Sequence, residues 1–356
     1  MTTGETFFIT GFPGFIATRL VAGLARAGSH FVLLVQPAFV ERARLEIVRL
    51  SEATGRDVSS FTIVEGDITK PNLGLSVQDS EIARDAATRV FHLAAAYDLA
   101  VPHETAQQVN VDGTRNVNAF VRSLRRLRHY HHVSTCYVAG KREGKILERE
   151  LRHDAGFRNF YEESKYQAEI EVESLKAELP VTIHRPAVVC GDSRTGETAK
   201  YDGVYYLIFY LLQWPKGLSL LNIGNHDVSL NLVPINFVVD AMVALAFDDG
   251  AIGKTLQLAD PNPLTTNQLF NAISESISGR RSRITAPASW VYFLLMLPPS
   301  PRITGLPHHA VPYFFVEQTY DSTQAQQLLA RHNIHCPPFT NYVDTIVDYA
   351  AKHPSA

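Results

Sequence analysis

Thr10-Gly11-Phe12-Pro13-Gly14-Phe15-Ile16-Ala17 follows a short apolar run and opens a helical pattern near the start of the 356-residue chain. Gly11 permits a tight turn, Gly14 lets backbone amides approach a pyrophosphate at the helix N-terminus, and the small Ala17 allows helix and strand to pack closely. A glycine turn that binds no ligand is the alternative interpretation. The position of the turn between a strand and a helix favours a dinucleotide site.

Short apolar runs alternate with helical patterns through the first half of the chain. The predicted strands are residues 7–10, 31–35, 61–64, 90–94, 131–135 and 181–185, and the predicted helices are about 15–27, 40–53, 105–127 and 160–178. This alternation is typical of an α/β fold with a doubly wound parallel sheet, the Rossmann fold, whose two faces are covered by helices.

The alternation ends near residue 190, and the later patterns include a helix at about 238–247 and a strand at 255–258. We expect residues 1–190 to form an NAD(P)-binding domain, to which about 225–260 return. Residues 191–356 would form a smaller mixed substrate-binding region over the carboxyl ends of the strands, where ligands bind in open α/β folds.

The composition favours some classes of protein over others. Hydrophobic residues make up 46% of the chain and charged residues 19%, which is typical of a globular enzyme, and the net charge of -3 gives no general reason to expect a nucleic-acid partner. Cys136, Cys190 and Cys336 are odd in number and widely spaced, which suits a reducing compartment. With no secretory signal pattern at the N-terminus, we expect a cytoplasmic protein.

Residues 290–297 are the most apolar late segment. Eight residues are far fewer than the roughly 20 that a membrane-spanning helix needs, so we expect no integral membrane segment. Pocket wall or core is the favoured interpretation, and peripheral contact with lipid is left open.

Tyr161 and Lys165 lie one helical turn apart in a predicted helix. A free tyrosine has a pKa of about 10, and a fixed positive charge nearby stabilises the phenolate and lowers that pKa toward the neutral range. Such a pair can protonate an alkoxide as it forms. An exposed helical pair without chemistry is the alternative, which the glycine turn disfavours.

The glycine turn and several later motifs together resemble the extended short-chain dehydrogenase/reductases. The motifs are Gly66-Asp67-Ile68, His92-Leu93-Ala94-Ala95, Asn110-Val111-Asp112-Gly113-Thr114, Val133-Ser134-Thr135, Tyr161 with Lys165, Arg185-Pro186 and Val233-Pro234-Ile235-Asn236-Phe237-Val238-Val239-Asp240. They occur in the family's order from about residue 5 to about 245. The glycine turn and the Tyr161 segment look most like the branch of fatty acyl-CoA reductases and thioester-reductase domains.

The resemblance implies roles for particular residues. Tyr161 would give a proton to the substrate carbonyl, Lys165 would lower the Tyr161 pKa and hold the nicotinamide ribose, and Thr135 would hydrogen-bond the substrate oxygen, with Ser134 as the alternative. The cofactor contacts that it implies are Thr10, Gly11, Phe12, Pro13, Gly14, Phe15, Ile16, Arg19, Gln36, Asp67, Ile68, Leu93, Ala94, Ala95, Asn110, Tyr161, Lys165, Pro186 and Val188. Pro186, together with Arg185, would lie beside the nicotinamide.

The end of the second strand bears on the choice of cofactor. An acidic residue there would hold the ribose hydroxyls of NAD, but this chain has Gln36. Arg19, Arg42 and Arg44 could supply positive charge to the 2'-phosphate of NADP, although each read singly is equally consistent with a solvated helix face. We therefore favour NADP(H) over NAD(H).

Two other chemistries are less favoured. Cys136 beside Thr135 invites a covalent thioester mechanism, but no partner base is evident and cysteines at strand ends are commonly packing residues. The histidines, including the compact group at positions 129, 131 and 132, do not suggest a four-ligand metal site. We expect loop and surface placement for that group and for His332 and His335, and no metal.

The expected substrate is a hydrophobic carbonyl compound, with an acyl thioester ahead of a ketone. Residues 205–214, including Trp214, and 290–297 are apolar, and residues 230–240 contain no basic residue to hold a sugar-nucleotide diphosphate. Because the chain has no carrier or adenylation domain, a thioester would arrive as a separate molecule. The alternatives are a dihydroflavonol- or hydroxysteroid-type ketone reductase, a sugar-nucleotide epimerase or dehydratase, and a nucleotide-sensing regulator without catalysis. The oligomeric state is open, with a homodimer as one alternative.

Overall fold

Seven parallel strands form the central sheet, in the order β11-β7-β5-β4-β1-β2-β3. They are β1 (Thr6–Thr10), β2 (His30–Val35), β3 (Phe61–Glu65), β4 (Arg89–His92), β5 (His129–Val133), β7 (Val181–Pro186) and β11 (Thr255–Leu258). The computed structural model describes residues 4–25, 29–213, 221–282 and 284–354. The predicted doubly wound parallel sheet is confirmed. Its strand order reverses beside β1, so the carboxyl ends of β1 and β4 border the crevice where such folds bind ligands.

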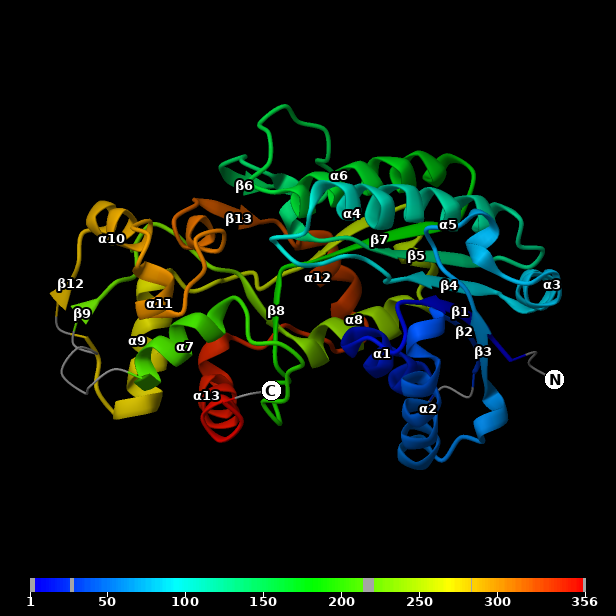
Figure 1. Cartoon of the computed structure of the whole chain (residues 1–356), viewed down its shortest axis with the longest axis horizontal. Coiled ribbons are helices and arrows are strands. Elements are labelled where there is room, and N and C mark those ends of the chain that lie inside the picture. The colour runs from blue at the N-terminus through cyan, green and yellow to red at the C-terminus, as the bar shows by residue number, and fades with distance from the viewer. Residues whose placement is uncertain (1–3, 26–28, 214–220, 283, 355–356) are drawn as a thin grey trace.

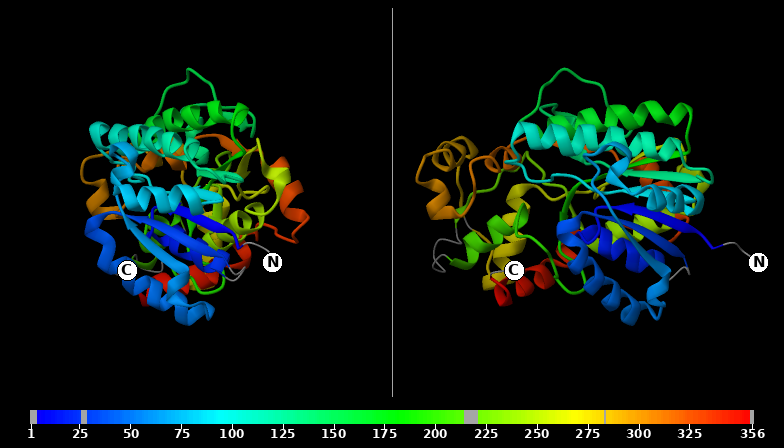
Figure 2. Two further views of the ribbon diagram at one scale, coloured as in Figure 1. Left: turned by 90° about the vertical axis from the view of Figure 1, so that its right-hand side faces the viewer. Right: turned by 45° about the vertical axis from the view of Figure 1, so that its right-hand side comes forward.

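Helices cover both faces of the sheet, as Figure 1 and the two views of Figure 2 show. One layer holds α1 (Phe15–Ala25), α2 (Val40–Thr54), α8 (Ile235–Leu245) and α12 (Thr323–Ala330), and the other holds α3 (Val77–Ala86), α4 (His103–Ala106), α5 (Gly113–Arg122) and α6 (Phe160–Glu173). Phe7 and Ile9 pack into the first layer and Phe8 into the second. Alternate residues of a strand point to opposite faces, so a strand buried on both faces is apolar throughout.

The predicted helix at 105–127 is divided in the structure. Helix α4 continues into a π-helical segment, Gln107–Asp112, before α5 begins at Gly113. Single π turns are rare and are frequently found at functional sites. Other short helical turns among the described residues are Pro37–Phe39, Val58–Ser60, Pro71–Gly74, Cys136–Ala139, Ser174–Ala177, Asp249–Ala251, Val311–Phe314 and Phe339–Asn341.

Several segments after residue 190 belong to the sheet and its helical layers. β11 pairs with β7 at the sheet edge, and α8 packs against α1. Gly23 makes that approach close, because a Cβ at this position would lie 2.7 Å from Val243 Cγ2. Farther along, β13 (Gln318–Tyr320) pairs in parallel with β6 (Gly144–Ile146). The chain therefore crosses between the two parts of the molecule more than once.

The second part of the molecule is mainly helical. Helices α7 (Val204–Gln213), α9 (Thr266–Ser278) and α13 (Val343–Lys352) share one apolar core, and α10 (Ala288–Leu295) and α11 (Ser300–Thr304) lie beside a smaller one. Two short parallel pairs complete it, β8 (Val188–Cys190) with β10 (Leu232–Pro234), and β9 (Leu221–Asn222) with β12 (Ile284–Thr285). Figure 1 shows α10 at the end of the molecule remote from β3. Trp214 lies outside the described residues.

One expectation about burial is wrong, and another is confirmed only in part. His129, His131 and His132 are buried in β5 rather than on the surface, because β5 is an inner strand covered on both faces. Residues 290–297 are mostly neither core nor pocket wall: Val291 and Leu295 are buried, but the other large side chains of this segment are exposed. Within the described part of the chain, no helix combines the length and apolarity needed to cross a membrane.

Candidate active site

The turn between β1 and α1 is pressed against the loop that follows β4. Gly11 has φ +90°, and a Cβ on it would lie 2.9 Å from the backbone nitrogen of Ala94. The Gly14 amide donates to the Gly11 carbonyl at 2.8 Å, while Phe12 and Pro13 are buried and Gly14 is exposed. Only residues without side chains fit both glycine positions, and the exposed backbone at the start of α1 suits a pyrophosphate.

Thr10 links the two segments that border this crevice. Its hydroxyl hydrogen-bonds His92 Nδ1 at 2.8 Å and accepts from the Ala94 amide at 3.1 Å. Thr10 thus ties the end of β1 to the loop after β4, in which Leu93, Ala94 and Ala95 are partly buried. Phe15 and Ile16 are partly buried at the start of α1.

Asn110, in the π-helical segment, fixes the other side of the same loop. Its amide oxygen accepts from the Ala96 amide at 2.8 Å, and its Nδ2 donates to the Ala96 carbonyl at 3.0 Å and to Ser164 Oγ at 2.9 Å. Because Ser164 lies on α6 beside Lys165, Asn110 connects the predicted cofactor loop to the helix that carries Tyr161. Asn110 therefore ties this loop to α6.

The residues expected around the adenosine lie at the ends of β2 and β3. Gln36 is exposed, the Asp67 carboxylate accepts from the Thr69 amide at 2.8 Å, and Ile68 is buried. Gly113 faces Ile68, because a Cβ at position 113 would lie 2.8 Å from Ile68 Cδ1.

The three arginines that could favour NADP, which are Arg19, Arg42 and Arg44, differ in whether their charges are already paired with carboxylates. Arg19 is paired with Asp192 at 3.0 Å and with Glu197 at 2.6 Å, so two carboxylates already share its charge. Arg44 lies 3.5 Å from Glu41 on the exposed face of α2. Arg42 is exposed in the first turn of α2 and forms no ion pair with any described residue. Of the three, Arg42 is the best placed to offer a free charge.

Thr135, Tyr161 and Lys165 come together at the carboxyl end of β5. The Thr135 side chain lies close enough to the Tyr161 phenol to lower its pKa. Thr135 also accepts from the Tyr137 amide at 3.2 Å, which caps the short helical turn that follows β5. Lys165 is buried, and its Nζ donates to the Val133 carbonyl at 2.8 Å. The predicted acid, its hydroxyl partner and an ammonium group therefore share one site.

Ser134 points away from this site. Its hydroxyl donates to the carboxylate of Glu169, which also pairs with Arg185 through Nε at 2.9 Å. All three side chains are buried. Of the two alternatives left open by the sequence, the geometry favours Thr135 for the substrate oxygen. Arg185 is held in this ion pair, while Pro186 ends β7 and Val188 begins β8, where the sheet meets the second part of the molecule.

The protonation equilibria of Tyr161 and Lys165 are governed by burial. Burial raises the pKa of Tyr161 to about 12, against the lowering effect of the Thr135 side chain. Burial also lowers the pKa of Lys165 to about 8, against the raising effect of the Glu169 charge. In this chain by itself the Tyr161 pKa therefore lies above its ordinary value rather than below it, because desolvation dominates.

The other candidate chemistries find little support in the geometry. The Cys136 thiol is buried, donates to the Arg185 carbonyl at 3.2 Å and has a pKa raised by burial, which opposes formation of a reactive thiolate. His332 is bonded to Asp248 at 3.1 Å, and His335 is exposed. Across the residues with described positions, no group of three His, Cys, Asp or Glu side chains is arranged to hold a metal ion.

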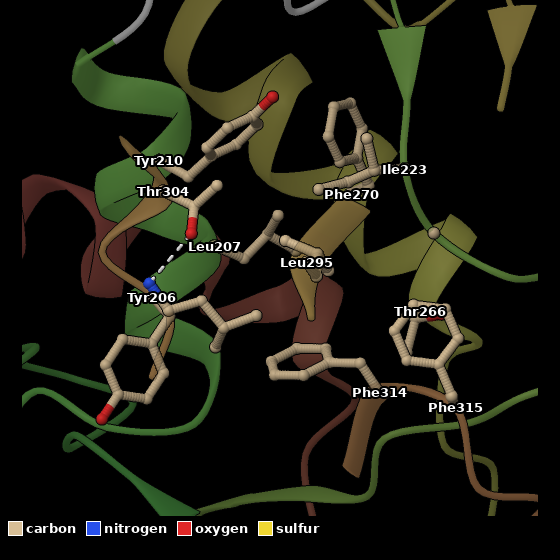
Figure 3. Close-up of a pocket in the computed structure, with 12 residues that line it drawn as sticks. Tyr206, Leu207, Tyr210, Ile223, Thr266, Phe270, Leu295, Thr304, Phe314 and Phe315 are labelled. Carbon is tan, nitrogen blue, oxygen red and sulfur yellow. Dashed lines mark hydrogen bonds between the residues drawn. The ribbon is translucent and has the colours of Figure 1, made fainter. Parts of the chain in front are cut away.

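An apolar cavity lies in the helical part of the molecule. Figure 3 shows the side chains that converge on it from α7, α9, α10 and the segment around Phe314. Its lining is Tyr206, Leu207, Tyr210, Ile223, Gly224, Thr266, Phe270, Leu295, Thr304, Leu306, Phe314 and Phe315. Tyr206, which lines this cavity, and Tyr161 both lie within electrostatic reach of the Asp202 carboxylate.

Sequence reasoning missed one connection between the two parts of the molecule. Tyr313 donates to the buried carboxylate of Glu162 at 2.5 Å and accepts from Asn159 Nδ2 at 2.8 Å. Its ring also lies 4.6 Å, centroid to centroid, from that of Tyr137. Tyr313 thus fixes the start of α6, directly beside Tyr161. No local pattern marks it, since its partners are about 150 residues earlier in the chain.

Comparisons with known proteins agree with this architecture. The family model described as "Male sterility protein" matches residues 9–242. Fatty acyl-CoA reductase wat of Drosophila melanogaster is 25% identical over 280 residues, which cover 68% of this chain and 54% of that protein. A linear gramicidin synthase chain of Brevibacillus parabrevis is 25% identical over 76% of this chain but only 5% of its own length. The chain thus spans about half the length of the fatty acyl-CoA reductase.

Solved structures show the same fold. The terminal R domain from the myxalamid PKS-NRPS biosynthetic pathway superposes with a TM-score of 0.82 and 24% identity, covering 100% of this chain and 93% of that one. The reductase domain of a nonribosomal peptide synthetase from Mycobacterium tuberculosis has a TM-score of 0.72 and 17% identity, covering 98% and 91%. The residues that match the family model, 9–242, are nearly those over which the family motifs occur, from about residue 5 to about 245. The chain therefore belongs to the male sterility protein family, a thioester-reductase-like branch of the extended short-chain dehydrogenase/reductases that bind a nicotinamide cofactor.

Proposed function

We propose that this protein is an NADP(H)-dependent reductase of hydrophobic carbonyl compounds, with acyl thioesters as the first candidates. The observation that carries the proposal is the grouping of Thr135, the nearby Tyr161 and buried Lys165 at the carboxyl end of β5. The glycine turn lies at the crevice beside the neighbouring strand β4, and an apolar cavity lies beyond Tyr206. This combination supports reduction of an apolar substrate.

The glycine turn fits the proposed dinucleotide. The Gly11 backbone lies where a side chain would strike Ala94, and Gly14 leaves the N-terminus of α1 open. When bound, the reduced nicotinamide supplies hydride to the substrate carbonyl. Gln36 offers no carboxylate to repel a 2'-phosphate, and exposed Arg42 lies in the next helix. These features support NADP(H) over NAD(H).

Tyr161 and Thr135 would act on the substrate oxygen. As negative charge develops on that oxygen, Thr135 donates a hydrogen bond and Tyr161 donates a proton. Lys165, held by the Val133 carbonyl, supplies positive charge that stabilises the Tyr161 phenolate left behind. For a thioester the product of the first step is a hemithioacetal, whose collapse breaks the C–S bond, releases the thiol and leaves an aldehyde.

Apolar surroundings support the substrate class. The cavity lining is almost entirely aromatic and aliphatic, and residues 230–240 bring no basic side chain to hold a diphosphate. The names of the relatives, a fatty acyl-CoA reductase and a linear gramicidin synthase, agree with an acyl thioester that arrives from a separate molecule or domain. The three cysteines are free thiols, which fits a cytoplasmic setting.

A substrate panel tests the proposal. The purified chain is incubated with NADPH and medium to long acyl-CoAs, hydrophobic ketones or nucleotide sugars, while cofactor oxidation and product mass are followed. Aldehyde and free CoA are the expected products, formed on the order of a hundredfold more slowly with Tyr161→Phe. A secondary alcohol from ketones alone would favour a ketone reductase. Conversion of a nucleotide sugar without net cofactor oxidation would indicate an epimerase or dehydratase, and cofactor binding without turnover would indicate a regulator.

A further inference from the structure

Helix α10 and the residues just after it expose an unusual number of large apolar side chains. The exposed fractions are 71% for Trp290, 65% for Phe293 and 56% for Leu294, and Leu297 is also exposed. These four positions are spaced i, i+3, i+4 and i+7, so the helical ones share one face. A surface helix normally turns its apolar stripe inward and its polar side outward, and clustered exposed apolar residues mark an interaction site.

The inner side of α10 is already occupied. Val291 and Leu295 are buried, and Leu295 lines the apolar cavity. Helix α10 is therefore apolar on both sides, with one side facing the cavity and the other facing outward. The exposed side chains could turn inward only by displacing Val291 and Leu295 from their buried positions.

The sequence that flanks α10 on both sides carries charge of one sign. Residues 276–316 contain no Asp, Glu or Lys, and their ionisable cations are Arg280, Arg281, Arg283, Arg302, His308 and His309. Arg280 and Arg302 are exposed and form no ion pair with any residue whose position is described. Arg281 is paired with Glu275 at 2.8 Å. In a chain with net charge -3, this long stretch without carboxylates is a local exception.

We propose that the α10 surface, defined as Trp290, Phe293, Leu294 and Leu297, docks on a membrane that contains anionic lipid, assisted by Arg280 and Arg302, which flank α10 in the sequence. The aromatic and aliphatic side chains would enter the boundary between headgroups and acyl chains, and the guanidinium groups would contact lipid phosphates. Helices with this composition lie in the membrane plane, and basic side chains nearby strengthen binding to anionic lipid.

Other occupants fit this surface less well. In a symmetric dimer the same patch would face itself, and residues 276–316 contain no carboxylate to pair with the arginines of the other copy. Protein interfaces also carry about one hydrogen bond per 100–200 Å², and the Trp290 indole is the sole side-chain donor among the four apolar positions. Figure 1 places α10 at the opposite end of the molecule from β3, so docking there leaves the glycine turn uncovered.

Vesicle binding tests the proposal without reference to catalysis. The full chain is sedimented with phosphatidylcholine vesicles that contain no anionic lipid or about one third phosphatidylglycerol. We expect binding to the anionic vesicles, at least a tenfold weaker partition coefficient for Trp290→Ser/Phe293→Ser, and a several-fold weaker one for Arg280→Gln/Arg302→Gln or at high salt. The matched control is Leu45→Ser/Val48→Ser, which removes similarly exposed apolar side chains from α2 and should leave binding unchanged.

Fluorescence gives an independent readout of the same contact. The chain has two tryptophans, so Trp214→Phe leaves Trp290 as the single reporter. Anionic vesicles should shift its emission to the blue, and lipids brominated high on their acyl chains should quench it. Each variant is first checked for an unchanged circular dichroism spectrum and melting temperature. Absence of vesicle binding, equal loss in the α2 control, or self-association that Trp290→Ser/Phe293→Ser abolishes would overturn the proposal.

Discussion

Acid should destabilise this fold well above the pH at which carboxylates become protonated. Five histidines on three neighbouring strands are buried, and burial lowers the pKa of each of them: His92, His129, His131, His132 and His184. Their folded pKa values lie below their unfolded value of about 6.5. The folded state therefore keeps them neutral, while the unfolded chain takes up protons as the pH falls through 6.5, so stability is complete above that pH and decreases below it.

The size of this effect follows from proton linkage. Between pH 7.5 and 6.0, a histidine that titrates only in the unfolded state removes about 0.8 kcal/mol of folding free energy, and five remove about 4 kcal/mol. A domain is typically stable by about 5–15 kcal/mol, so this loss is large. Carboxylates contribute little in the same interval, because their unfolded pKa values are about 4.

Urea unfolding at a series of pH values, followed by circular dichroism, measures the effect. His132 offers a sharp variant, because neither of its ring nitrogens has a hydrogen-bond partner among the described residues. His132→Leu should reduce the loss between pH 7.5 and 6.0 by about 0.8 kcal/mol. A loss below about 1 kcal/mol in the wild type would refute the reasoning, because the histidines would then be titrating in the folded state.

Three further predictions concern the site. Tyr161→Phe should lower turnover on the order of a hundredfold with cofactor affinity nearly unchanged, whereas Lys165→Ala should also weaken cofactor binding. Steady-state rates and fluorescence titration of the cofactor measure both effects. Wild-type turnover in Tyr161→Phe would show that Tyr161 is not the proton donor. Thr135→Ala should reduce kcat by one to two orders of magnitude with normal stability. Ser134→Ala should instead cost about 1–3 kcal/mol of stability through the lost Glu169 contact, and the reverse pattern would exchange their roles. NADPH should bind more tightly than NADH, and Gln36→Asp should reverse the order; a tenfold preference of the wild type for NADH contradicts the NADP(H) assignment.

Local sequence patterns were sufficient to predict the central sheet and the family of the protein. The strand patterns and the glycine turn predicted a parallel Rossmann sheet, and the ordered motifs pointed to the extended short-chain dehydrogenase/reductases; both conclusions are confirmed. Such features can be predicted because hydrophobic periodicity and turn residues act over a few positions. The pairing of Tyr161 with Lys165 was visible for the same reason, since one helical turn brings them to one face.

Only the tertiary structure decided where individual side chains point and what surrounds them. Ser134 and Thr135 are adjacent in extended backbone, so they face opposite sides, and sequence alone left their roles exchangeable. His131 is buried because strands far apart in the chain enclose β5 on both edges. Tyr313 reaches Glu162 across about 150 positions, and Trp290 is exposed because no other described segment covers that side of α10. Burial and long-range contacts depend on how distant segments pack, and a local sequence pattern does not determine that packing.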